Sequence, residues 1–312
     1  MNKQPIKLLP AFRDYLWGGT KLKTEFKKVS DLEKIAESWE LSTHKDGNSI
    51  VASGEFAGLN LYEYIKAIGE DCIGSNAMAF EFFPILIKFI DAADNLSIQV
   101  HPSDEYALKY EGQYGKTEMW YILDCEEDSF IYYGVNKEIS KEEFRKSIEE
   151  NKVLDVLNKV KVKKGDVFFI DAGTIHAIGK GIMICEIQQN SNLTYRVYDY
   201  DRRDKDGKAR ELHIDKACEV AKLAPSEPYK TENENILAKC KYFTVEKLVC
   251  KDKADFKLSN DSFKSLIAVS GKGEICVGAN TLEFSKGDSI FIPAQDGVCK
   301  VFGDCELIIS YV

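Results

Sequence analysis

The first residues with clear chemical potential lie on one short segment of the chain. Gln99 and His101 alternate there with Ile98 and Val100, and Pro102 follows directly. Because successive side chains of a strand point to opposite faces, the amide and the imidazole should share one face and the two aliphatic groups the other. Pro102 should end the strand, since proline has no N–H group to donate to a sheet. The segment therefore predicts a polar site beside an apolar wall.

Two further candidates lie beside other strand-like segments. Glu118 is near the start of the predicted strand 117–123, and His176 follows the predicted strand 164–170. Imidazole and carboxylate groups are common ligands of divalent cations such as zinc, iron and manganese, and an amide oxygen can join them. Three or four protein ligands leave a position for water or substrate. The predicted metal ligands are His101, Glu118, His176 and Gln99.

The alternative is that these side chains are ordinary structural residues. A single histidine is more often a hydrogen-bonded core residue than a metal ligand, and a single glutamate usually faces solvent. Here Glu118 directly precedes Met119, Trp120 and Tyr121, and burial of those side chains would bury a carboxylate that then needs a partner. His44 and His213 have no such neighbours, so we interpret them as ordinary polar residues.

A second polar group lies between residues 186 and 202, where amides, acids, tyrosines and arginines are dense. The planar guanidinium of Arg196 suits a phosphate or a developing oxyanion. Glu186 could move a proton, and Lys116 would add a cation near Glu118. The alternative, which the residue types favour equally, is a surface network of ion pairs. Its members would be Arg196, Asp199, Asp201 and Arg202.

The composition limits the possible partners and the compartment. The chain has 312 residues, of which 44% are hydrophobic and 30% charged, as in soluble globular proteins with more than one domain. The net charge of -9 argues against nonspecific binding to nucleic acid or to an anionic membrane. The nine cysteines form no CxxC pair, and the polar N-terminus does not resemble a signal peptide. We therefore expect reduced thiols and a cytoplasmic protein.

The local patterns predict a chain rich in strands with a few short helices. Helix-capping residues are available at Asn60, at Ser103 and at Ser140, which begins the capping-box sequence Ser-Lys-Glu-Glu. The segments 84–91 and 96–101 are expected to pair as strands around a short polar turn. The other predicted strands cover 36–42, 117–123, 164–170, 182–198 and most of 242–312. The predicted helices cover 61–68, 103–111, 138–160 and 213–223, and a linker covers 224–238.

Two stretches of the chain resemble each other. Residues 163–172 and 285–294 each contain Lys-Gly-Asp followed by a hydrophobic segment. This repetition predicts two β-units of the same kind. At the same offset, His176 of the first unit corresponds to Val298 of the second. The second unit is therefore expected to keep the fold pattern without the polar site.

At this point the chain resembles a known family. The Gln-Val-His-Pro element at 99–102, with the later histidine and arginine, is similar to the type I mannose-6-phosphate isomerases (phosphomannose isomerases) of the shorter bacterial class, which are metal-dependent cupin proteins. In the loop before Arg196, this chain has Asn-Ser-Asn-Leu-Thr where longer members carry Ser-Asp-Asn. The matching stretches run in family order to about residue 215. They cover 17–19, 37–40, 96–102, 115–121, 172–177, 188–191 and 195–199.

The resemblance implies a fold and a domain division. The expected fold is mainly β, with two cupin-type jelly-roll barrels and a small helical insertion at about 138–160. The N-terminal domain, residues 1–235, would hold one zinc ion or another divalent metal through the four predicted ligands. The C-terminal domain, residues 236–312, would have no metal ligands.

The resemblance also implies an activity, the interconversion of mannose 6-phosphate and fructose 6-phosphate through a cis-enediol. Arg196 would be the catalytic arginine, with Lys116 and Glu186 lining the site. Glu186 is the candidate base, and the alternatives are a metal-bound hydroxide and the region of His101. The phosphate would meet Lys116 or Arg196. The expected partner is a small sugar phosphate, with no nucleic acid or membrane, and the protein would be a monomer or homodimer. Two rival functions are a cupin oxygenase or decarboxylase and a non-catalytic sugar-phosphate-binding cupin.

Overall fold

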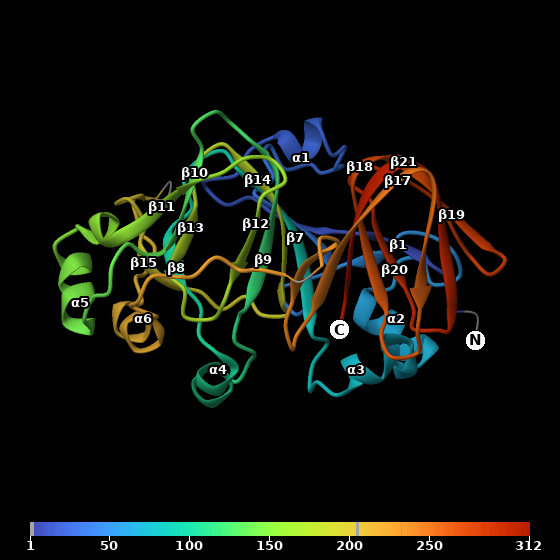
Figure 1. Cartoon of the computed structure of the whole chain (residues 1–312), viewed down its shortest axis with the longest axis horizontal. Helices are drawn as coiled ribbons and strands as arrows, with labels where there is room; N and C mark the ends of the chain where they lie inside the picture. Colours follow the sequence, from blue (N-terminus) through green and yellow to red (C-terminus); the bar gives the residue numbers. More distant parts are fainter. Residues whose placement is uncertain (1–2, 204–205, 232) are drawn as a thin grey trace.

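The computed structural model describes residues 3–203, 206–231 and 233–312, and strands dominate it. Figure 1 shows two β-rich units side by side, one built mainly from the middle of the chain and the other mainly from its C-terminal part. The predicted mainly β class is confirmed.

Two facing sheets form the larger unit. One has the order β12-β9-β14-β7-β3-β2 and the other β11-β10-β13-β8-β15. A shared apolar core lies between them, with Trp120 and Ile184 from the first sheet and Ile131 and Ile178 from the second. The first sheet comprises β2 (Ala11–Arg13), β3 (Glu37–Leu41), β7 (Ile85–Ala92), β9 (Glu118–Cys125), β12 (Val167–Ile170) and β14 (Ile182–Gln189). The second comprises β8 (Ile98–Val100), β10 (Phe130–Val135), β11 (Leu157–Lys161), β13 (His176–Ile178) and β15 (Tyr195–Tyr198).

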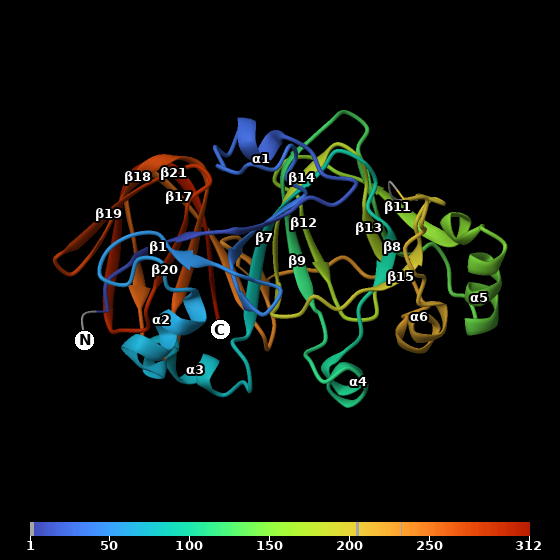
Figure 2. The same cartoon turned by 180° about the vertical axis from the view of Figure 1, so that it is seen from behind.

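The second unit is one sheet that includes strands from both ends of the chain. Its order is β16-β17-β21-β18-β20-β1-β6, and β19 also pairs with β18. Figure 2 shows β1 beside β20, although the two are nearly the whole chain apart in sequence. The division expected at residues 235 and 236 stays a prediction. The strands are β1 (Ile6–Leu9), β6 (Ile50–Val51), β16 (Ile236–Lys239), β17 (Thr244–Leu258), β18 (Lys264–Val277), β19 (Asn280–Ser285), β20 (Ser289–Ile292) and β21 (Gly297–Tyr311).

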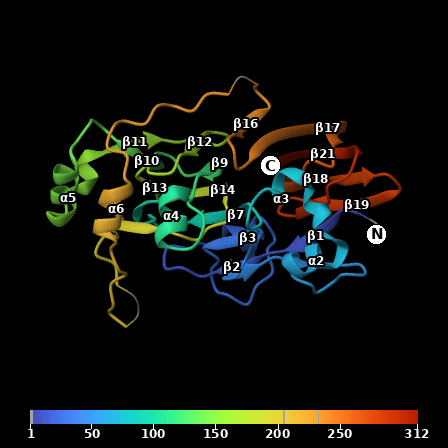
Figure 3. The ribbon, with the colours of Figure 1, turned by 90° about the horizontal axis from the view of Figure 1, so that it is seen from below.

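The helices are short and lie outside the sheets. Asn60 and Ser140 form the predicted capping boxes of α2 and α5, whereas Ser103 stands at the N-cap of α4 without a side-chain cap bond. Figure 3 shows α5 and α6 at the end remote from the C-terminal sheet. No helix in the described residues is both long and apolar enough to cross a membrane. The helices are α1 (Lys21–Thr24), α2 (Leu61–Ile68), α3 (Gly74–Met78), α4 (Asp104–Tyr110), α5 (Lys141–Glu149) and α6 (Ile214–Val220), with 3-10 turns η1 (Glu70–Ile73) and η2 (Val153–Val156).

Two local predictions are wrong. The segments 84–91 and 96–101 do not pair, because β7 pairs with β3 and β14 whereas β8 pairs with β13 and β15 in the opposite sheet. The turn between them therefore carries the chain from one sheet to the other. The predicted helix 138–160 also ends early, because residues 157–161 form β11 and pair with β10.

The two similar stretches do form the same turn. Gly165 and Gly287 both have a positive φ, at 89° and 96°. The carboxylate of Asp166 accepts a hydrogen bond from the Lys163 N–H at 2.9 Å, and that of Asp288 accepts one from the Ser285 N–H at 2.8 Å. β12 and β20 follow these turns.

Candidate active site and metal centre

Three of the predicted ligands meet between the two sheets of the larger unit. His101 follows β8, His176 begins β13 in the same sheet, and Glu118 begins β9 in the facing sheet. One ligand atom from each lies within 4.8 Å of the others, and all three side chains are buried. Gln99 of β8 is paired in register with His176 on one side and with Arg196 of β15 on the other. Strand pairing thus gathers residues that are far apart in sequence.

The two imidazoles are oriented by backbone carbonyl groups. His101 donates from Nδ1 to the Leu193 carbonyl at 2.8 Å, and His176 donates from Nδ1 to the Thr174 carbonyl at 2.9 Å. Each Nε2 atom therefore keeps a free lone pair. His101 Nε2 lies 3.7 Å from Glu118 Oε2, and His176 Nε2 lies 3.3 Å from Glu118 Oε1. Burial lowers the pKa of His101 well below its usual value and that of His176 to about 4. Both rings are therefore neutral, the form that binds metals.

The Glu118 carboxylate is the strongest sign of a cation site. Neither of its buried oxygens makes a hydrogen bond of good geometry, although Lys116 Nζ lies 2.7 Å from Oε2. Burial, followed by the negative charge of Glu186, raises the pKa of Glu118. Lys116 offsets the charge of this buried carboxylate, and the two imidazole lone pairs that face its oxygens complete a set of donors for a further cation. This set of donors fits a divalent metal.

The predicted fourth ligand adjoins the cluster. The Gln99 amide nitrogen lies 3.3 Å from His176 Nε2. Because the oxygen and nitrogen of an amide exchange places by a half-turn of the group, Gln99 can present its oxygen at the same point. Its role as a ligand stays a prediction.

A polar cavity of about 230 Å³ opens beside the cluster. The predicted residues Gln99, Lys116, Glu186 and Arg196 all line it. The structure therefore brings every predicted site residue to one place. Polar side chains around a small cavity suit a small hydrophilic ligand.

One carboxylate oxygen of Glu186 accepts a hydrogen bond, and the other makes none. Trp120 Nε1 donates to Oε1 at 3.0 Å, whereas Oε2 is buried without a hydrogen bond. Lys88 and Lys116 lie 3.5 and 3.8 Å from Oε2. Burial alone would raise the pKa of Glu186, but the two lysines outweigh it and lower the pKa. Glu186 is thus an ionised carboxylate able to accept a proton.

The comparisons with known proteins match the whole chain. A model of the type I phosphomannose isomerase catalytic domain matches residues 6–128, and a model of the mannose-6-phosphate isomerase cupin domain matches residues 233–312. The mannose-6-phosphate isomerase ManA of Bacillus subtilis is 39% identical over 325 residues, with 100% of both chains covered. The chain belongs to the type I mannose-6-phosphate isomerase family.

Other members and solved structures agree with this assignment. The mannose-6-phosphate isomerase of Streptococcus mutans is 37% identical, with 99% of this chain and 98% of the relative covered. A crystal structure of mannose 6-phosphate isomerase from Bacillus subtilis superposes with a TM-score of 0.90 at 36% identity, covering 99% of this chain and 100% of the other. The predicted cupin fold class is thereby confirmed.

Of the predicted surface ion-pair network, only the pair of Asp199 and Arg202 forms, and Asp199 is buried. Asp199 also pairs with Arg210. Neither Arg196 nor Asp201 makes an ion pair among the described residues. Arg196 instead donates from Nη1 to the Glu211 carbonyl at 2.9 Å, and its buried Nε has no hydrogen-bond partner in the described part of the chain. The backbone N–H of Arg196 also donates to His213 Nδ1.

The sequence prediction missed three charged residues that line the cavity, Lys88, Glu37 and Arg210. Lys88 is buried in strand β7, which is apolar apart from Lys88 and Asp91, and lies 3.4 Å from Glu37 Oε2. A lysine within an apolar run was a usable signal, since a buried lysine requires a carboxylate partner. Glu37 is fixed by Trp39, whose Nε1 donates to it at 2.7 Å.

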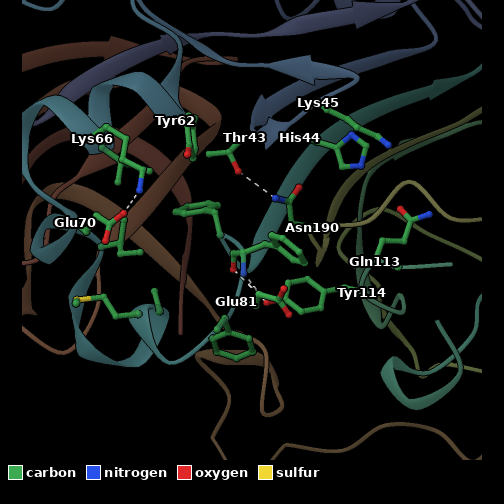
Figure 4. Close-up of a pocket in the computed structure, with 18 residues that line it drawn as sticks. Thr43, His44, Lys45, Tyr62, Lys66, Glu70, Glu81, Gln113, Tyr114 and Asn190 are labelled. Carbon is green, nitrogen blue, oxygen red and sulfur yellow. Dashed lines mark hydrogen bonds and ion pairs between the residues drawn. The ribbon is translucent and has the colours of Figure 1, made fainter. Parts of the chain in front are cut away.

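A larger groove of about 650 Å³ lies elsewhere, between α2 and the hairpin of β4 (Thr43–His44) and β5 (Gly47–Asn48). Figure 4 shows Tyr114 and Tyr62 at this groove, with Asn190 bonded to Thr43. None of the predicted metal or catalytic residues lines it. The predicted site residues lie at or beside the smaller cavity instead.

Proposed function

We propose that this chain is a metal-dependent aldose–ketose isomerase that interconverts mannose 6-phosphate and fructose 6-phosphate. The observation that carries the proposal is the buried set of His101, Glu118 and His176 beside the cavity that Glu186 and Arg196 line. The relatives that match the full chain are themselves named mannose-6-phosphate isomerases.

We propose that His101, Glu118 and His176, with Gln99, hold one zinc ion. A solved mannose 6-phosphate isomerase that shares this fold, with a TM-score of 0.78 at 19% identity, is described as bound with zinc and yttrium. Two imidazoles and a carboxylate are a usual donor set for a zinc ion with an open position. Such an ion supplies Lewis-acid polarisation of sugar oxygens and offsets developing negative charge.

We assign the proton transfer and the stabilisation of negative charge to residues around the cavity. Isomerisation removes a proton from C2 of the open-chain sugar and returns one to C1 through a cis-enediol. Glu186 Oε2 is the proposed base, because it is ionised, lines the cavity and makes no hydrogen bond of its own. Lys88 and Lys116 hold that carboxylate in place. Arg196 offers a guanidinium to the charge of the enediolate or to the phosphate.

The rival functions use the same protein groups. A cupin oxygenase or decarboxylase would need the His and carboxylate set with iron or manganese, and dioxygen uptake would reveal an oxygenase. A non-catalytic sugar-phosphate-binding cupin would bind mannose 6-phosphate without exchanging its C2 proton. The cationic lining of the cavity favours a phosphorylated ligand. Of the two rival functions, it therefore supports the sugar-phosphate-binding protein over the oxygenase or decarboxylase.

The nine cysteines are all free thiols. This suits a reducing compartment, and we propose a cytoplasmic enzyme that acts as a monomer or homodimer.

The deciding experiment is a coupled assay that follows fructose 6-phosphate formation from mannose 6-phosphate. It is run on the purified protein, after chelation, and after zinc is returned. We expect activity that the chelator removes and zinc restores. Absence of turnover in protein shown to be fully zinc-loaded would reject the isomerase and shift support to the other two functions.

A further inference from the structure

A buried carboxylate organises the arginines at one side of the cavity. Asp199 is 6% exposed and directly follows β15, the strand that carries Arg196. Arg210 donates to it twice, from Nε to Oδ2 at 2.8 Å and from Nη2 to Oδ1 at 2.6 Å. Arg202 donates from Nη2 to Oδ1 at 2.7 Å. The bidentate pairing fixes the plane of the Arg210 guanidinium as well as its position.

This cluster has more positive than negative charge. Arg202 and Arg210 share the carboxylate of Asp199, and Arg202 also lies 3.8 Å from Asp94. Arg196 makes no ion pair within the described part of the chain, and burial, followed by the positive charge of Arg210, lowers its pKa. Arg196 Nε is buried without a hydrogen-bond partner among the described residues. The surplus charge and the unused donor favour an anion at this point.

Only two of the three guanidiniums face the cavity. Arg196 and Arg210 line it, whereas Arg202 does not and is held instead by the Asn95 carbonyl at 2.6 Å. Of the five N–H donors of Arg210, Asp199 takes two. Arg202 therefore acts as an anchor of Asp199, and Arg210 is the arginine that Asp199 presents to a ligand.

Lys116, the other cation considered for the phosphate, already lies beside carboxylates. Lys116 Nζ lies 2.7 Å from Glu118 and 3.8 Å from Glu186, so two carboxylates surround it. Even with the proposed zinc ion neutralising Glu118, a dianionic phosphate placed there would face the Glu186 carboxylate at close range, which is unfavourable. The phosphate is better placed on the arginine side, with the reacting carbons toward the metal centre.

We infer that Asp199 is a positioning residue that fixes Arg210 at the cavity, where Arg210 and Arg196 together bind the phosphate of the sugar substrate. The inference rests on the proposed function, because it assigns one end of that substrate. It also adds a role in recognition for the charged loop that follows β15.

The test compares Arg210→Met with Arg203→Met, a matched control. Arg203 lies in the same loop and carries the same charge, but it donates to the Gly207 carbonyl and does not line the cavity. Three quantities are measured on zinc-loaded enzyme: KM and kcat for mannose 6-phosphate, and the inhibition constant of inorganic phosphate. We expect Arg210→Met to raise KM and the inhibition constant about tenfold to a hundredfold, as for a lost charge-assisted contact, with a smaller change in kcat. Arg203→Met should stay within about twofold of wild type.

The positioning role of Asp199 is tested by Asp199→Asn and Asp199→Glu. We expect Asp199→Asn to raise the same two constants severalfold, and Asp199→Glu to restore part of the loss because it keeps the charge. A merely structural role would lower thermal stability or the fraction of active enzyme and leave the phosphate inhibition constant unchanged.

Each failure has a distinct signature. If wild type turns over mannose 6-phosphate but Arg210→Met behaves like Arg203→Met, the phosphate lies elsewhere and the inference is wrong while the proposed function stands. Phosphate bound only at the metal would give that same result. If zinc-loaded wild type does not isomerise mannose 6-phosphate, the proposed function itself fails, and with it the substrate whose phosphate Arg210 is assigned to bind.

Discussion

At the scale of single residues, the site depends on buried charges that need one another. Glu118, Glu186, Lys88 and Lys116 are all buried around one small cavity. Each of these groups would be costly alone in an apolar interior, so removing one leaves its partners uncompensated. The predictions at this scale therefore separate loss of metal from loss of chemistry.

We expect Glu118→Gln to lose the metal. The substitution keeps the shape of the side chain but removes the only carboxylate of the proposed ligand set. Zinc content should fall to a small fraction of the wild-type value, and activity at limiting zinc should fall at least a hundredfold. Chelation should lower the Tm of wild type by several degrees, because bound metal stabilises the native state, and should leave the Tm of Glu118→Gln unchanged. An unchanged zinc content, measured by atomic emission, would show that Glu118 is not a ligand.

We expect Glu186→Gln to keep the metal and lose turnover. Loss of a general base typically costs a factor of about 10² to 10⁴ in rate. Zinc content and thermal stability are measured beside kcat, so that a folding defect is recognised. Near-normal kcat in the zinc-loaded variant would reject Glu186 as the base.

At the scale of secondary structure, two matched pairs of positions separate local contributions to stability. The first pair is the N-caps of two short helices. Ser140 completes a capping box on α5, whereas Ser103 at the N-cap of α4 makes no side-chain cap bond.

We expect Ser140→Ala to lower the free energy of unfolding by about 1 kcal/mol, and Ser103→Ala to lower it by clearly less. Kinetic constants of Ser140→Ala should be unchanged, because α5 lies at the end remote from the C-terminal sheet and no residue of α5 lines the cavity. Urea unfolding of both variants measures the difference. Equal losses would show that the capping bond of Ser140 contributes nothing.

The second pair is Gly165 and Gly287, which occupy equivalent positions in the two Lys-Gly-Asp turns. Both have positive φ, so alanine is strained at either position by about 1–2 kcal/mol. A Cβ at Gly287 would also lie 2.5 Å from the Phe26 carbonyl oxygen, whereas one at Gly165 meets nothing within 4 Å. Gly287→Ala should therefore destabilise more than Gly165→Ala in the same urea assay. The reverse order would contradict the close approach at Gly287.

At the scale of the whole molecule, the two units are joined through the N-terminal strands. Ile6 and Leu8 of β1 are buried in a core cluster that also contains Phe89 of the larger unit and Phe291 of the C-terminal sheet. Because this core crosses from one unit to the other, neither can lose its packing without exposing apolar surface of the other.

We accordingly expect a single cooperative transition when the zinc-loaded protein is heated in a calorimeter. A fragment of residues 236–312 made alone would lack β1 and β6, and we expect it to remain unfolded by circular dichroism. Two separated transitions in the whole protein, or a folded fragment, would show that the units are independent.

The sequence by itself predicted the candidate metal ligands and most of the local elements. The alternation around Gln99 and His101, the capping boxes at Asn60 and Ser140, and the two Lys-Gly-Asp turns all depend on neighbours within a few residues. Propensity, side-chain alternation and glycine conformation act over that range, so these features can be recognised in the chain alone.

Only the tertiary structure decided which segments meet. The placing of β7 and β8 in opposite sheets, the pairing of β1 with β20, and the separation of Arg196 from the Asp199 ion pairs depend on contacts between distant parts of the chain. Likewise, Lys88, Glu37 and Arg210 reach the cavity only once the sheets face each other. A local pattern specifies which face of a strand is polar, but the partner of that face is selected by packing of the whole core.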